Sequence, residues 1–291
     1  MISVISQVRN TTLSLISKLI PYLQIRYYSL PGIYLLTDGF GAFEENLLTN
    51  INIYFDVETV KYADTVIDLG AHIGTFTLYA ILRAKPNTNI IAVEPDRTNY
   101  RILLNNIRKL SKIIKEKNIK LITLNMAVWY KQGKFRFRNI GWSEGGYLTG
   151  DPCTSQDKEC VDTVTLDKLI ELSNGRIIAK IDIEGAELPV LLFSKSLTRI
   201  SDIAIEPHGN ETLITKILRQ YGYSVQYIEY KLNSTLYKYW INISPKIFGI
   251  SVALYRLLAS TVLIPKITIL KATKPHYDNI TKVMKSYTLL I

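Results

Sequence analysis

The sequence predicts a doubly wound α/β fold, and two observations support that prediction. From about residue 60, short apolar runs alternate with stretches of helical composition. A glycine turn follows the first of these runs, as expected where a strand leads into a helix beside a ligand. Strands that alternate with helices need crossover connections. We therefore expect a mostly parallel sheet that is covered by helices on both faces.

The expected strands are short apolar runs spaced along the chain. They comprise Val66 to Leu69, Asn89 to Val93, Lys120 to Val128, Arg176 to Ile183, Ile203 to Glu206 and a closing strand at Lys266 to Ala272. Helices are expected after the first, second and fourth strands, the second of them from about Asp96 to Leu110. An acidic residue before a helix satisfies free backbone donors, so Asp96 is expected to cap this helix.

The length predicts one main domain with terminal additions. The domain is placed at residues 38–230, with an inserted hairpin or flap near 132–152, where aromatic and basic residues alternate before several glycines. Residues 1–37 are expected to form an amphipathic helix and a linker. Residues 231–291 are expected to add a helix and the closing strand.

Both terminal helices are apolar enough to raise the question of a membrane. Residues 246–265 are mostly apolar, but Lys246 and Arg256 interrupt them, which favours a buried or interfacial helix over a membrane span. The N-terminal apolar stripe is expected to pack on the core or on a second subunit of a homodimer, with peripheral membrane contact as the alternative. No secretory cleavage site follows it, so a cytoplasmic location is expected.

Charge and cysteine content exclude little. The formal charge of +10 would attract anionic partners, but the basic residues are scattered along the chain, which favours a generally basic surface over a specific nucleic-acid site. Cys153 and Cys160 are the only cysteines and are too few for a zinc site unless other ligands complete it. Free thiols are expected, with a local disulfide as the alternative.

The first expected strand leads into the sequence Asp68-Leu-Gly70-Ala-His-Ile-Gly74. Gly70 and Gly74 allow the backbone to approach a ligand closely, and the helix that follows favours an anionic group at its N-terminus. The glycine spacing differs from the dinucleotide fingerprint, and Asp68 would repel a pyrophosphate. Its carboxylate would instead accept a hydrogen bond from an ammonium group, such as that in the amino-acid part of S-adenosylmethionine.

Glu94 ends the second expected strand. A carboxylate at this strand tip, beside the glycine turn, is placed to accept hydrogen bonds from both hydroxyls of a ribose. The alternative role for Glu94 is to cap the following helix.

Charged residues end the fourth and fifth expected strands. Lys180, Asp182 and Glu184 would point to one side of a strand, because side chains alternate with period two. Three charges on a buried strand are costly unless they pair or serve a cleft, so a structural ion pair of Lys180 stays open beside a functional role. Glu206 ends the fifth strand and His208 follows it, at the same edge of the sheet.

Residues 38–210 resemble the FkbM-type methyltransferases, a subfamily of the Rossmann-like S-adenosylmethionine enzymes. The matching segments are VIDLGAHIGTFTLYA from residue 66, IAVEPDRTNYRILLNNI from 91, the turn at Ala127 and Val128, VDTVTLDKLI from 161, KIDIEGAELPVL from 180 and IAIEPH from 203. The family commonly has asparagine where this chain has His72, a departure that a backbone contact would tolerate.

The resemblance implies a class I methyltransferase fold, with a seven-stranded sheet whose last strand is reversed. It implies S-adenosylmethionine as the cofactor, with contacts from Asp68, Gly70, His72, Gly74, Glu94 and Ala127. The residues implied to face the methyl group and its acceptor are Lys180, Asp182, Glu184 and Glu206, and the position of His208 at the same edge makes it a further catalytic candidate. Many members methylate hydroxyl groups, so O-methylation of a sugar, a glycan or a small natural product is expected.

Methyl transfer from a sulfonium is an in-line displacement, so the protein mainly aligns the acceptor with the methyl group. A hydroxyl acceptor benefits from a general base, for which His208 is the first candidate and Asp182 or Glu206 the next. No metal is expected to be needed.

Other functions stay open. A nucleic-acid methyltransferase should show an aromatic-proline motif after the fourth strand, where this chain has Asp182-Ile-Glu184-Gly185, so no specific nucleic-acid partner is expected. A protein methyltransferase and a non-catalytic cofactor-binding protein of the same fold are further alternatives. Cofactor binding without turnover of any hydroxylated acceptor would support the last of these.

Overall fold

The computed structural model describes most of the chain between residues 53 and 274. The described ranges are 53–139, 146–154, 157, 159–231 and 266–274, with the backbone of two short antiparallel strands, β1 (Gln24–Arg26) and β2 (Tyr34–Leu36). The helices expected at 2–20 and 246–265 lie outside these residues, as does the centre of the expected flap at 140–145. None of the helices in the described part of the chain has the length and apolar character that a membrane span requires.

The chain divides into two compact units, residues 1–226 with 270–291 and residues 227–269. The second unit is described only at its ends, 227–231 and 266–269. The predicted domain boundaries after residues 37 and 230 stay predictions.

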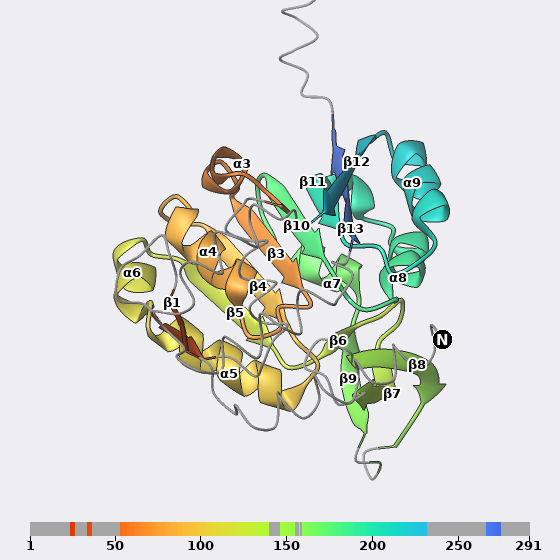
Figure 1. The fold of residues 1–291 in the computed structure, drawn as a ribbon, viewed down its shortest axis with the longest axis horizontal. Coiled ribbons are helices and arrows are strands. Elements are labelled where there is room, and N and C mark those ends of the chain that lie inside the picture. The colour runs from red at the N-terminus through yellow and green to blue at the C-terminus, as the bar shows by residue number, and fades with distance from the viewer. Residues whose placement is uncertain are drawn as a thin grey trace, which may run out of the picture. The chain divides into compact units, whose positions relative to one another are not determined.

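The main sheet consists of seven strands, namely β3 (Thr65–Leu69), β4 (Asn89–Val93), β5 (Lys120–Leu124), β10 (Ile177–Ile181), β11 (Ile200–Ile205), β12 (Ser224–Lys231) and β13 (Lys266–Thr273). Their order in space is β12-β13-β11-β10-β3-β4-β5 (Figure 1). The five strands from β11 to β5 are parallel, whereas β13 runs antiparallel to β11. The doubly wound, mostly parallel fold is therefore confirmed. The strand order reverses between β3 and β10, where open α/β sheets bind ligands at the carboxyl edge.

The helices before and between these strands follow the predicted alternation. They are α3 (Val57–Lys61), α4 (Thr75–Arg83), α5 (Arg97–Arg108), α6 (Ser111–Glu116), α7 (Leu166–Glu171), α8 (Glu187–Phe193) and α9 (Glu211–Gln220). Asp96 caps α5, because its carboxylate accepts hydrogen bonds from the backbone N–H groups of Thr98 and Asn99 at 2.7 and 2.9 Å. The predicted cap is confirmed.

Helices cover both faces of the main sheet, as predicted. Ile67 and Leu69 of β3 belong to a buried apolar cluster that includes residues of α7, α8 and α9. Asp68, between them, points to the other face and accepts a hydrogen bond from Thr77 of α4. Figure 1 shows α4 and α5 on one side of the sheet and α8 and α9 on the other.

The strand predicted at Lys120 to Val128 is divided in the structure, so that prediction is wrong in its second half. β5 ends at Leu124, and β6 (Ala127–Val128) belongs to a different sheet. Asn125 separates them, because its side-chain amide donates hydrogen bonds to the main-chain oxygens of Glu94 and Pro95 at 2.8 and 3.0 Å. An apolar run alone does not reveal such a turn.

A second sheet contains β6 together with β7 (Gly133–Asn139), β8 (Gly146–Pro152) and β9 (Cys160–Val164). Its order is β6-β9-β7-β8, and β7 pairs antiparallel with both β8 and β9. The stretch in which a hairpin or flap was expected thus contributes two strands to this sheet.

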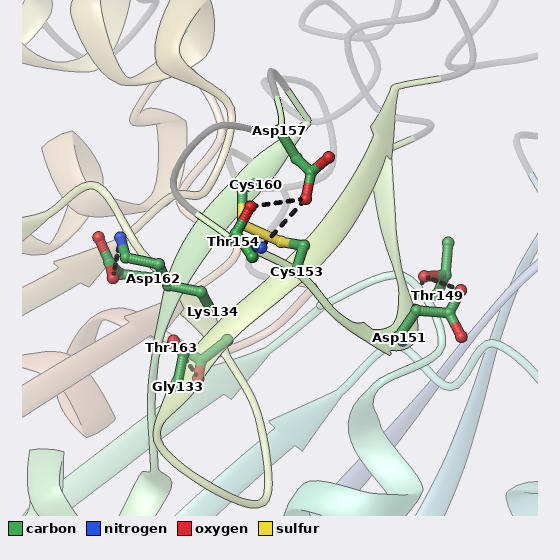
Figure 2. Close-up of a disulfide and its surroundings, with 10 residues drawn as sticks. All are labelled: Gly133, Lys134, Thr149, Asp151, Cys153, Thr154, Asp157, Cys160, Asp162 and Thr163. Carbon is green, nitrogen blue, oxygen red and sulfur yellow. Dashed lines mark hydrogen bonds and ion pairs between the residues drawn. A yellow bond between two sulfur atoms is a disulfide. The ribbon is translucent and has the colours of Figure 1, made fainter.

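Cys153 and Cys160 form a disulfide, with their Cα atoms 6.0 Å apart (Figure 2). The expectation of free thiols is therefore wrong, and the alternative of a local disulfide is correct. Cys153 follows β8 and Cys160 begins β9, and these strands lie on opposite sides of β7. The bond therefore joins the residue after β8 to the first residue of β9. The sequence shows the spacing of the two cysteines but not whether their Cβ atoms converge.

Reduction of the disulfide is expected to lower the free energy of unfolding by about 2.5 kcal/mol, the loop-closure entropy for a loop of this size. The two cysteines are seven residues apart, so breaking the bond gives the unfolded chain more conformational freedom. Urea denaturation with and without a reductant measures the difference. The double variant Cys153→Ser/Cys160→Ser should match the reduced protein, and any response of this variant to the reductant would contradict the assignment.

Candidate functional site

The turn after β3 brings the backbones of neighbouring strands into close contact. Gly70 has a left-handed φ of +74°, and its backbone N–H donates a hydrogen bond to the carbonyl of Val93 at 3.0 Å. A Cβ atom on Gly70 would overlap the main-chain oxygen of Asp182. Glycine is therefore required at position 70 by the adjacent strand end, in addition to any requirement that a ligand imposes.

Lys180 and Asp68 form a buried ion pair between β10 and β3. They are opposite each other in the register of the two strands, and neither side chain has any exposed surface. Lys180 Nζ lies 3.7 Å from Asp68 Oδ1 and donates a hydrogen bond to the carbonyl of Gly70 at 2.8 Å. Asp68 Oδ2 accepts a hydrogen bond from the hydroxyl of Thr77 at 2.5 Å. The ion pair that the sequence left open thus exists, and it fixes the glycine turn.

Asp182 stands immediately after β10 and contacts two further side chains. Its Oδ2 lies 3.2 Å from Lys180 Nζ and accepts a hydrogen bond from the hydroxyl of Tyr54 at 3.3 Å. The same hydroxyl lies 3.2 Å from Oε2 of Glu206. Tyr54 is only 2 % exposed, and its ring centre lies 5.2 Å from Lys180 Nζ. Sequence reasoning missed Tyr54, because it precedes the first expected strand and belongs to no motif.

Glu206 follows β11 and is placed beside Asp182 by the sheet. Ile181 and Ile205, the last residues of β10 and β11, are paired in register. Burial of the side chain and the nearby charge of Asp182 raise the pKa of Glu206 to about 8. Glu206 is therefore mostly protonated at neutral pH.

Glu184 does not continue the strand, so the prediction that it follows the period-two alternation is wrong. β10 ends at Ile181, and Glu184 has a left-handed φ of +53°. Its carboxylate oxygen nevertheless lies 3.4 Å from Nε2 of His208. Burial of the side chain raises the pKa of Glu184 to about 7, against the opposing effect of His208.

His208 lies between two carboxylates. Its Nδ1 is 3.1 Å from Oε1 of Glu187, a buried carboxylate that also accepts the backbone N–H groups of Ile183 and Gly185. Burial alone would lower the pKa of His208, but the hydrogen bond to Glu187 and the charge of Glu184 raise it to about 10. An imidazolium cannot accept a proton, so this charge state argues against His208 as the general base at neutral pH.

Glu94 lies on the other side of the glycine turn, at the carboxyl end of β4. Its Oε2 accepts the backbone N–H of His72 at 2.8 Å, and its Oε1 accepts that of Asp96 at 2.9 Å. Glu94 is 5 % exposed, and burial raises its pKa to about 7. The hydrogen bond from position 72 is donated by the backbone, so it does not itself require asparagine there.

The model of the Methyltransferase FkbM domain matches residues 68–239, which is more than half of the chain. The chain belongs to the FkbM methyltransferase family. It is therefore a methyltransferase, as the sequence predicted. Tyr54 lies before the matched residues.

Solved structures with similar folds include three methyltransferases of low sequence identity. The FkbM methyltransferase of Methylobacillus flagellatus is 20 % identical with a TM-score of 0.40, over 57 % of this chain and 40 % of that protein. A precorrin-6y C5,15-methyltransferase of Geobacter metallireducens is 13 % identical with a TM-score of 0.37, over 75 % of this chain and 85 % of that one. Phosphoethanolamine N-methyltransferase 2 of Haemonchus contortus, in complex with S-adenosyl-L-methionine, is 9 % identical with a TM-score of 0.42, over 82 % and 53 %. A comparison with curated proteins gives no significant match.

In this FkbM methyltransferase, most predicted site residues lie at the carboxyl edge of β3, β4, β10 and β11. The catalytic candidates fall into two groups of contacting residues. Each group includes one residue of the short stretch after β10. Lys180, Asp182 and Glu206 meet at Tyr54 and the glycine turn, whereas Glu184 and His208 meet beside Glu187. The carboxylate of Asp68 faces Lys180 and Thr77, so its predicted contact with the ammonium group of the cofactor stays a prediction. The predicted cofactor contact of Ala127, in β6, also stays a prediction.

One set of side chains has the composition of a metal site. Asp182, Glu184 and His208 each offer a ligand atom, and these atoms lie within 4.8 Å of one another. Carboxylates and imidazole are common metal ligands. Ion pairs already engage all three side chains, with Lys180 as the partner of Asp182. We assign no metal to this set, and the expectation that none is needed stays a prediction.

Proposed function

We propose that this chain transfers a methyl group from S-adenosylmethionine to a hydroxyl group of a sugar, a glycan or a small natural product. The proposal rests above all on Glu94, because its carboxylate is held by two backbone N–H groups at the carboxyl end of β4. A carboxylate has about four lone-pair positions, so about two remain for the paired hydroxyls of a ribose. The family membership supports the same reading.

The residues around the glycine turn fit the donor. His72 and Asp96 orient Glu94 for the ribose, and the carbonyl of Gly70 is fixed by Lys180. Asp68, which is buried against Lys180 and Thr77, holds the lysine that bonds to this turn. S-adenosylmethionine, when bound, supplies a methyl group that is activated by a positively charged sulfur. The surrounding carboxylates are compatible with that charge.

A hydroxyl acceptor is supported by the carboxylates at the ends of β10 and β11. Oxygen nucleophiles need a base in methyl transfer, and a useful base has a pKa near the working pH. Burial and the charge of Asp182 raise the pKa of Glu206 into that range, to about 8. With a pKa of about 8, Glu206 is ionised in part at neutral pH, whereas His208, with a pKa of about 10, is almost entirely protonated. Asp182 and Glu206 therefore become the favoured candidates for the base.

The affinity for a ribose-containing ligand is expected to fall as the pH falls below about 7. Burial raises the pKa of Glu94 to about 7, so this carboxylate is charged above that pH and gains a proton below it. Hydrogen bonds to a charged acceptor are stronger, and we expect about tenfold weaker binding at roughly pH 5.5 than at roughly pH 8. Methylthioadenosine is a suitable probe for calorimetry, because it has the nucleoside but no amino-acid part that titrates in this range.

The variant Glu94→Gln should bind methylthioadenosine weakly at every pH, without this dependence. Glu171→Gln serves as a control, because Glu171 is an exposed residue of α7 that pairs with Lys168. Equal affinity in the wild type and in Glu94→Gln across the pH range would refute the ribose assignment.

A further inference from the structure

The hydroxyl of Tyr54 touches two carboxylates from adjacent strands. It lies 3.3 Å from Asp182 Oδ2 and 3.2 Å from Glu206 Oε2. A phenol can donate one hydrogen bond and accept another at the same time. The hydroxyl can therefore donate a hydrogen bond to one carboxylate while it accepts a hydrogen bond from the other, if the other is protonated.

The main chain keeps the two carboxylates close. Asp182 and Glu206 follow paired residues of β10 and β11, and the backbone N–H of Glu206 donates to the carbonyl of Ile181 at 3.0 Å. Two carboxylates held together cannot both ionise easily. One proton between them relieves the repulsion.

The charges around the pair favour the proton on Glu206. The ammonium of Lys180 lies 3.2 Å from Asp182 and pairs with its carboxylate. Within the described residues, Glu206 makes no ion pair. The groups that act on its charge are Asp182, His208, Lys180 and Tyr54. The arrangement that results is a neutral Glu206 donating to the Tyr54 oxygen, and the Tyr54 hydroxyl donating to the carboxylate of Asp182.

Tyr54 is held in this position by its ring. The ring lies edge-on to Phe76 of α4 at a centroid distance of 5.9 Å and against the ammonium of Lys180 at 5.2 Å. Because the side chain is buried on all sides, the hydroxyl has little freedom to leave the two carboxylates.

We propose that Tyr54 is a positioning residue that joins Asp182 and Glu206 into one proton-accepting unit for methyl transfer. This inference rests on the proposed function. As the acceptor oxygen bonds to the methyl carbon, the carbon–sulfur bond breaks and its electron pair stays on sulfur. The proton of the acceptor hydroxyl passes to an ionised carboxylate of the unit, which later releases the proton to water.

The unit can be tested without knowledge of the acceptor. The full chain, with glutamate labelled by ¹³C at the side-chain carboxyl, is titrated by NMR. We expect one glutamate carboxyl to titrate at about pH 8, matching the raised pKa of Glu206, and to be absent in Glu206→Gln. In Tyr54→Phe this midpoint should rise by about 0.5 to 1 pH unit, because the hydrogen bond that the charged carboxylate loses is stronger than the one that the neutral carboxyl loses.

Tyr79→Phe is the matched control. Tyr79 is another buried tyrosine beside Phe76, but its hydroxyl donates to the main-chain oxygen of Phe55. Its removal should leave the titration at about pH 8 unchanged. A midpoint that is the same in Tyr54→Phe as in the wild type would overturn the proposal, as would a wild-type titration that Glu206→Gln does not remove.

Methylthioadenosine binding separates this proposal from the proposed function. All three variants should bind the nucleoside as the wild type does, because none of the changed residues is placed at the ribose. Failure of the wild type to bind methylthioadenosine would refute the proposed donor site. The NMR titration would then decide by itself whether Tyr54, Asp182 and Glu206 form the proton-accepting unit.

Discussion

Replacement of Lys180 by methionine is expected to lower the free energy of unfolding by about 3–5 kcal/mol. The ammonium of Lys180 is fully buried, lies near the carboxylates of Asp68 and Asp182 and donates to the carbonyl of Gly70. Methionine has a similar length but leaves both carboxylates without this partner in a buried environment. Urea denaturation, followed by circular dichroism, measures the loss.

Two further variants separate the ion pair from other effects. Lys168→Met removes an exposed lysine that pairs with Glu171, and it should cost less than about 1 kcal/mol. In the background of Lys180→Met, the change Asp68→Asn should restore part of the lost stability, because it removes one of the uncompensated charges. A loss below about 1 kcal/mol in Lys180→Met would show that the buried pair contributes little.

The variant Gly70→Ala is expected to lose about 2–5 kcal/mol of stability and to weaken nucleoside binding. The left-handed φ of Gly70 costs an L-residue about 1–2 kcal/mol, and overpacking adds about 1–3 kcal/mol. The added Cβ would overlap the main-chain oxygen of Asp182, so the end of β10 must move. That movement displaces Asp182 from Tyr54 and Lys180. Denaturation and calorimetry with methylthioadenosine measure the two effects.

Gly222→Ala separates backbone strain from steric overlap. Gly222 has a left-handed φ of +85°, but nothing lies within 4 Å of a Cβ added there. This variant should lose only the conformational cost of about 1–2 kcal/mol and should keep its nucleoside binding. Equal losses of stability in the two glycine variants would show that the end of β10 can move away from an added Cβ at no measurable cost.

Much of the fold was predictable because it depends on local patterns. Asn89 to Val93 was predicted with the bounds of β4, since apolar runs of this length between turns indicate buried parallel strands. The cap at Asp96 follows from the chemistry of a carboxylate before a helix. The division of the strand after Leu124 was missed, because the side-chain amide of Asn125 bonds to carbonyls about thirty residues earlier in the chain.

The sequence predicted the positions of the site residues better than their protonation states. The strand-end rule placed Asp182, Glu206 and His208 at one edge, and they do lie there. The rule gives no protonation state. His208 was the first candidate for the base, yet the neighbouring Glu187 and Glu184 raise its pKa to about 10. Their proximity depends on the left-handed turn at Glu184, which a period-two pattern cannot anticipate.

The sequence by itself determined the doubly wound sheet, the family and the strand ends that carry acidic residues, because each depends on spacing along the chain. The tertiary structure alone decided that Tyr54 reaches Asp182 and Glu206, 128 and 152 residues away. It also decided that Cys153 and Cys160 are joined. Contacts and charge states of this kind depend on distances in space, which are set only when the strands pair and the buried groups lose their water.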